Sequence, residues 1–177
     1  MFFKRKRDSF VTRGNSNVYN ATDVAVYIIN YCAERNRPIN NLYLQKLLYF
    51  VYAFFLVETT EQKHLFKSNM VAWNFGPAFP EVYYSFDHYC CNKIPYLHEY
   101  STLTSIGKKP YIKTLINAKD RELIRYIIDK YSNCSVSEIV FLTQSQSPWF
   151  DAWGLSNHGK PITDKSIIEY FKYHRQR

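Results

Sequence analysis

The sequence lacks the short motifs that mark the common enzyme classes. It contains no HExxH, no P-loop and no GxSxG turn, and its histidines are scattered. Its four cysteines include no CxxC pair and no other zinc spacing. The nearest group of possible metal ligands is Asp87, His88, Cys90 and Cys91, which would need a distant fourth ligand that the sequence does not indicate. We therefore expect no catalytic residue, no metal and no cofactor.

The sequence also lacks an apolar run long enough to cross a bilayer. A membrane-spanning helix needs about 20 apolar residues, and the uninterrupted run over 47–57 is about half that length. The basic residues near the N-terminus are not followed by the apolar stretch of about 7–15 residues that a secretory signal requires. We therefore expect no membrane partner and a cytoplasmic location.

Acidic residues are outnumbered by basic ones, and the formal net charge is +8. Residues 1–14 carry +4 of this charge and residues 172–177 carry +3, so the body carries only +1. We expect 1–17 to form a flexible basic arm and 18–177 to form a single domain. One hypothesis for function is nucleic-acid binding through this arm and through the body patch of Lys108, Lys109 and Lys113.

The most informative stretch that is present is NLYLQKLLYFVYAFFLV at 41–57. From Leu42 onward, only Gln45 and Lys46 are polar apart from tyrosine hydroxyls. A helix that is apolar on nearly every face belongs in the middle of a protein. The sequence therefore predicts a mainly α fold, a compact domain of five to six helices with a small β element, organised around a central buried helix at about 41–57.

Other helices are predicted from apolar periodicity and from capping residues. A short strand is expected at 69–73, followed by a turn at Gly76 and Pro77. Two more strands are expected near 100–106 and 111–115, and a single turn is expected at 148–152. The other expected helices cover 20–35, 81–89, 117–131, 135–143 and about 163 onward.

Three stretches together resemble one family. They are NLYLQKLLYF at 41–50, VAWNFGPAFPEVYYSF at 71–86 and LTQSQSPW at 142–149. In order and spacing they resemble the Panacea domain, the SocA-like antitoxin and phage-associated protein family, and PITD with IIEYF near the end extends the similarity. It covers about residues 18–171.

The resemblance implies a helical antitoxin of a bacterial toxin-antitoxin system that binds a cognate toxin directly, and for some members an adaptor that hands the toxin to a cellular protease. Some members carry an added DNA-binding module, and 1–17 is too short to be one. A role as a phage or mobile-element accessory protein is the alternative within this family.

Two segments, 73–80 and 144–149, are candidates for partner binding because they are rich in aromatic and proline residues, which bind proteins with little loss of entropy. Each segment could equally be a turn that packs on the core, and Trp149 could be a buried core residue. Gln45 and Lys46 could fix the segment 73–80 against the helix, or Lys46 could extend to water while Gln45 bonds a nearby loop. The candidate partner-binding residues are Trp73, Phe75, Gly76, Pro77, Pro80, Gln144 and Trp149.

Overall fold

The computed structural model describes residues 18–58, 64–103, 106–154 and 159–175. These residues form seven α-helices, two short 3-10 helices and two small two-stranded sheets, which confirms the mainly α class. The α-helices are α1 (Ala21–Glu34), α2 (Asn41–Glu58), α3 (Pro80–Ser85), α4 (Ala118–Tyr131), α5 (Val136–Gln144), α6 (Ser147–Gly154) and α7 (Asp164–Arg175). The remaining elements are β1 (Val71–Trp73), β2 (Gly76–Ala78), η1 (Asp87–Tyr89), β3 (Glu99–Tyr100), β4 (Lys109–Pro110) and η2 (Lys113–Leu115).

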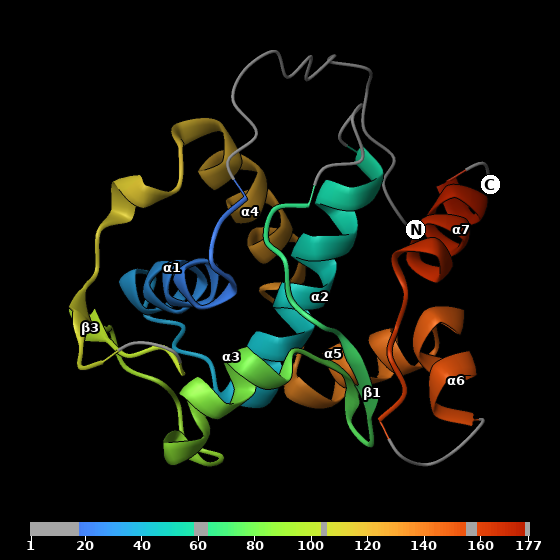
Figure 1. The fold of residues 1–177 in the computed structure, drawn as a ribbon, viewed down its shortest axis with the longest axis horizontal. Helices are drawn as coiled ribbons and strands as arrows, with labels where there is room; N and C mark the ends of the chain where they lie inside the picture. Colours follow the sequence, from blue (N-terminus) through green and yellow to red (C-terminus); the bar gives the residue numbers. More distant parts are fainter. Residues whose placement is uncertain (1–17, 59–63, 104–105, 155–158, 176–177) are drawn as a thin grey trace.

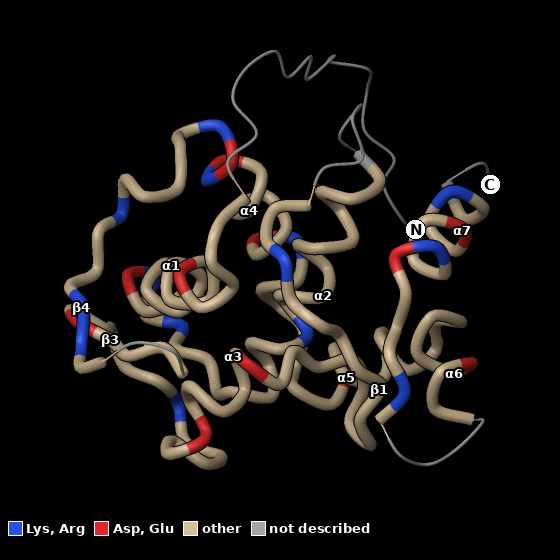
Figure 2. Tube along the Cα trace, in the orientation of Figure 1, with Lys and Arg blue, Asp and Glu red and all other residues tan. Residues whose placement is uncertain are grey.

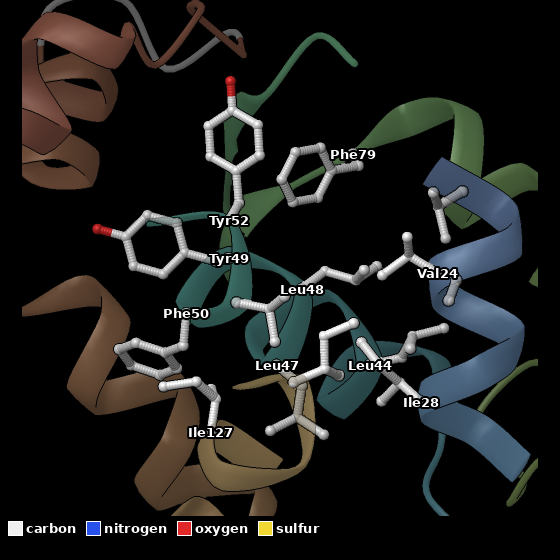
Figure 3. Close-up of a cluster of buried hydrophobic side chains, with 14 of the residues drawn as sticks. Val24, Ile28, Leu44, Leu47, Leu48, Tyr49, Phe50, Tyr52, Phe79 and Ile127 are labelled. Atoms are coloured by element: carbon white, nitrogen blue, oxygen red, sulfur yellow. The ribbon is translucent and has the colours of Figure 1, made fainter. Parts of the chain in front are cut away.

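Helix α2 runs through the middle of the fold, as its sequence predicts. Figure 1 shows it between α1 on one side and α6 and α7 on the other, and it contacts α1, α3, α4, α5, α7 and β2. Figure 3 shows leucines of α2 meeting Val24 and Ile28 of α1, while Phe50 faces Ile127 of α4. Packing on all sides explains why no face of α2 needs to be polar. No helix in the described ranges is long and apolar enough to cross a membrane.

Short polar side chains define where several helices begin. Asn20 accepts a hydrogen bond from the backbone N–H of Thr22 at 2.9 Å, and Asn117 accepts one from Asp120 at 2.9 Å. Helix α5 starts with a capping box in which Ser135 and Glu138 each accept from the other's backbone N–H. Such caps satisfy N–H groups that have no partner inside the helix, so these boundaries follow from local sequence.

Strands β1 and β2 form a tight antiparallel hairpin that packs against α2. Trp73 pairs with Gly76, so only Asn74 and Phe75 lie in the turn. The other edge of β1 is also bonded, because Ala72 donates to the carbonyl of Lys160 at 2.9 Å and Ile162 donates to that of Met70 at 2.9 Å. Strand β1 is therefore hydrogen-bonded on both edges, by β2 on one and by the segment that leads to α7 on the other.

Several local expectations differ from the structure. The single helix expected over 81–89 is divided, because α3 ends at Ser85 and 87–89 is 3-10 helix. The stretch at 148–152, expected as a single turn, is part of α6, and Pro148 fits there because proline is tolerated in the first turn of a helix. Gly76 and Pro77, expected only as a turn, belong to strand β2. The strand expected near 111–115 is wrong, since β3 pairs with Lys109–Pro110 and 113–115 is 3-10 helix.

Candidate functional site

The β1–β2 hairpin rests on the two polar residues of the central helix. Lys46 is only 1% exposed, and its Nζ donates to the carbonyl oxygen of Pro77 at 2.8 Å. Gly76 has a φ of +100°, and a Cβ there would lie 2.8 Å from Thr143 Oγ1 and 3.0 Å from Lys46 Nζ. The hairpin can approach the lysine this closely because residue 76 has no side chain. Lys46 therefore does not extend to water.

Gln45 makes a second contact just beyond strand β2, at the residue that precedes α3. Its Oε1 accepts from the backbone N–H of Phe79 at 2.9 Å, and its Nε2 donates to Asn41 Oδ1 at 3.1 Å. Asn41 in turn donates to the carbonyl of Tyr83 in α3 at 2.9 Å. This chain of amides ties α2 to the hairpin and to the start of α3, and each buried polar atom in it has a partner.

The far side of the hairpin is held by α5 and α6. Gln144 Nε2 donates to the carbonyl of Asn74 at 2.8 Å, and Trp149 Nε1 donates to that of Trp73 at 2.9 Å. The rings of Trp149 and Trp153 stack at 5.8 Å. The structure thus brings the segments around 73–80 and 144–149, which are far apart in sequence, to the same hairpin.

The residues singled out in sequence divide by exposure. Gly76, Pro77 and Trp149 are buried, with only 6% of Trp149 exposed, so these residues lie under the surface. Trp73, Pro80 and Gln144 are partly exposed. Phe75, at the tip, is 61% exposed, and no other candidate presents as much of its side chain.

Two tyrosines that pack beside Trp73 were not among the candidates chosen from the sequence. Tyr83 and Tyr84 of α3 pack edge-to-face on Trp73, with ring centroids 5.0 Å and 6.2 Å away, and Tyr84 remains 51% exposed. The apolar periodicity of 81–89 places Tyr83 on the core face of its helix, and Tyr84 carries no sequence signal beyond its residue type. The exposed aromatic surface therefore consists of Trp73, Phe75 and Tyr84, which we call the hairpin surface.

Burial changes the charge behaviour of Lys46. The pKa of its amine is lowered from 10.5 to about 7 because burial disfavours the charged form. A neutral amine can still donate to Pro77. Contact between the hairpin and α2 thus needs no buried positive charge above neutral pH.

The lysine patch proposed for nucleic acid is paired with carboxylates. Lys109 lies 2.6 Å from Asp23, Lys108 lies 3.0 Å from Glu99, and Lys113 lies 3.1 Å from Glu34. Figure 2 shows the acidic and basic positions side by side around β3 and β4. The pairs offset the positive charge that a phosphate backbone would require. The basic arm, 1–17, lies outside the described residues.

Two other polar clusters are weaker candidates for a functional site. His88, Cys90 and Cys91 are exposed around η1, and in the described part of the chain no three His, Cys, Asp or Glu residues gather in a way that could hold a metal ion. Tyr52 donates to Asp164 at 2.7 Å and lies 2.9 Å from His64 Nδ1, which joins α2 to the start of α7. Burial and the Asp164 carboxylate raise the pKa of Tyr52, so this phenol stays protonated.

Fold and site together define a class, a small helical domain that presents an aromatic turn on a hairpin braced from two sides. The comparisons with known proteins identify the family. Residues 44–150 match the family described as Antitoxin SocA-like, Panacea domain. The chain is also 30% identical over 164 residues to Antitoxin SocA of Caulobacter vibrioides (strain NA1000 / CB15N), covering 88% of this chain and 84% of that protein.

This chain belongs to the SocA-like antitoxin family, as its three motifs suggested. The matched region contains the central helix from Leu44 onward, the hairpin and the segment through Trp149. No solved structure matches the chain.

Proposed function

We propose that this protein is the antitoxin of a bacterial toxin-antitoxin pair and that it neutralises a cognate toxin by binding it directly through the hairpin surface. The antitoxin role rests on family membership and on the similarity to Antitoxin SocA. The choice of surface rests on one observation. Phe75 is 61% exposed at the tip of a hairpin whose base is fixed by buried side chains.

A fixed aromatic turn is suited to protein recognition for a physical reason. Binding costs free energy when loops and side chains become ordered, and less is lost if the segment is ordered beforehand. Lys46, Gln45 and Gln144 hold the backbone of the turn through carbonyl and N–H groups, and the tip side chain is left free of these contacts. Large aromatic residues that bury fully on binding dominate many interfaces.

The candidate residues then have different roles in the proposal. Phe75, Trp73 and Tyr84 contact the toxin, with Pro80 at the edge. Gly76 and Pro77 allow the hairpin to lie against Lys46, while Gln144 and Trp149 hold its turn from α5 and α6. Substitutions in the first group should affect binding, and substitutions in the second should affect stability first.

The experiment is co-expression with the neighbouring reading frame. That frame should be toxic when expressed alone and harmless when this chain is present, and the two proteins should co-purify. If the frame is harmless alone, or if no complex is recovered, the proposal fails. The amount of toxin in rescued cells separates two routes, since simple binding leaves the toxin level unchanged and delivery to a protease lowers it.

A further inference from the structure

A cavity of about 530 Å³ lies between the α1–α2 link and the α4–α5 link. Its size falls within the range of about 300–1000 Å³ that is usual for small-molecule sites. Buried apolar residues of the core, Leu47 and Ile128 among them, form part of its lining together with Cys32 and Tyr43. The proposed toxin-binding function does not use this cavity.

The rim of the cavity is built by ordered backbone. Helix α1 ends at Glu34, and Asn36 just beyond it has a φ of 57°. Arg37 N–H donates to Cys32 O at 3.0 Å and Asn36 N–H donates to Ala33 O at 2.9 Å. This is the bonding of a Schellman motif, which fixes the direction of the chain after a helix. Ile94 N–H donates to Ile39 O at 2.8 Å and so places Lys93 beside the same link.

The charges at the rim are mostly positive. Arg35, Arg37 and Lys93 line the cavity with a single acidic residue, Asp129, which accepts a hydrogen bond from Tyr31 at 3.0 Å. Within the described residues, neither Arg37 nor Lys93 has a carboxylate partner. The guanidinium of Arg35 lies 3.6 Å from the centre of the Tyr31 ring. An apolar interior therefore meets a rim with an excess of two positive charges.

We propose that this cavity binds a small ligand with an apolar body and an anionic head, such as a carboxylate, sulfonate or phosphate. The apolar body fills the space beside Leu47 and Ile128, and the head pairs with Arg37 and Lys93. The basic segment at 4–7 has the wrong sign of charge to occupy this rim. The cavity touches the first residue of α5, Val136, whereas the hairpin is bonded by its last, Gln144, so the two sites lie at opposite ends of that helix.

The test compares two probes of nearly equal shape on the full chain, anilinonaphthalene sulfonate and its uncharged counterpart phenylnaphthylamine. Calorimetry should give saturable binding of one sulfonate per chain, about tenfold tighter than the neutral probe, because a charge-assisted contact at the rim adds roughly that factor. Equal affinity for the two probes, or no saturable binding of the sulfonate, would overturn the proposal.

Two further measurements locate the binding. Arg37→Gln combined with Lys93→Gln should weaken the sulfonate about tenfold, while Lys172→Gln on α7, away from the cavity, should leave it unchanged. Both rim residues are exposed, so we expect the variant to fold. Bound sulfonate should also slow maleimide modification of Cys134, which lines the cavity, with the exposed Cys90 and Cys91 as internal references. An unchanged affinity or an unprotected Cys134 would place the probe elsewhere.

Discussion

At the scale of single residues, the contact between Gly76 and Lys46 determines how closely the hairpin can lie against α2. Gly76→Ala forces a side chain onto a φ of +100° and places its Cβ 2.8 Å from Thr143 Oγ1. We expect the free energy of unfolding to fall by about 2–4 kcal/mol, measured by urea denaturation.

Two other glycines separate the causes of this loss. Gly107→Ala meets no atom within 4 Å but has a φ of +84°, so it reports the backbone cost alone. Gly154→Ala meets neither difficulty and should be close to neutral. If Gly76→Ala costs no more than Gly107→Ala, the close approach to Lys46 and Thr143 is not important for stability.

Lys46 should give the protein a pH-dependent stability. Its pKa is about 7 in the folded protein and near 10.5 when unfolded, so between these values the unfolded chain binds more protons and the free energy of unfolding rises with pH. Relative to Lys46→Met, wild type should gain at most about 1.4 kcal/mol per pH unit from pH 7 to 9. The difference should be flat below pH 6.

Urea denaturation of wild type and Lys46→Met at several pH values from 5 to 9 measures this difference in the free energy of unfolding. Staying below pH 10 avoids ionising the tyrosines, several of which have pKa values raised by burial. Parallel pH profiles for the two proteins would mean that Lys46 is charged, or reaches water, in the folded state.

At the scale of elements, α2 supports the other parts of the fold and should not itself recognise a partner. Leu48 is fully buried, and Leu48→Ala should lower the free energy of unfolding by about 2–5 kcal/mol. Leu115→Ala makes the same chemical change at a residue that is 45% exposed and should cost less than about 0.5 kcal/mol. Equal losses for the two variants would contradict the central role of α2.

How far these elements could be predicted depends on whether their cause is local. The apolar pattern of α2 and the helix caps are local, so the sequence indicates them, although it allows Thr22 as well as Asn20 and Ser137 as well as Ser135. For Lys46 the sequence left two interpretations open, contact with the segment 73–80 or extension to water, and only the fold decides between them, because the acceptor Pro77 is 31 positions away. Strand β2 was missed for a similar reason, since Gly-Pro indicates a turn until pairing with β1 is known.

The same distinction applies to the candidate site. The sequence indicated the aromatic turn from residue types alone, but exposure depends on tertiary packing. Trp149 and Phe75 are both candidates because they are large aromatic residues. Packing against the hairpin buries Trp149, whereas Phe75 at the tip stays exposed. Tyr84 joins the surface only because α3 lies beside Trp73.

At the scale of the whole molecule, the charge is divided unevenly, with +4 in residues 1–14. If the chain binds nucleic acid, removing these residues should abolish an affinity that falls steeply with salt. We expect the truncated protein to keep its melting temperature and its neutralising activity, because antitoxin action is assigned to the hairpin surface. Loss of neutralisation on truncation would count against that assignment. Toxicity rescue and thermal melting of the truncated chain provide the measurement.

The central claim is that the toxin is recognised by an exposed turn on a folded core. Calorimetric titration of purified toxin into wild type, Phe75→Ala and Leu115→Ala tests it most directly, with a thermal melt recorded for each protein. The η2 segment that contains Leu115 lies well away from the β1–β2 hairpin in Figure 1, so this exposed residue is a suitable control. The account predicts that Phe75→Ala melts like wild type and binds at least about 30-fold more weakly, while Leu115→Ala changes neither quantity. Wild-type affinity in a folded Phe75→Ala protein would contradict the account.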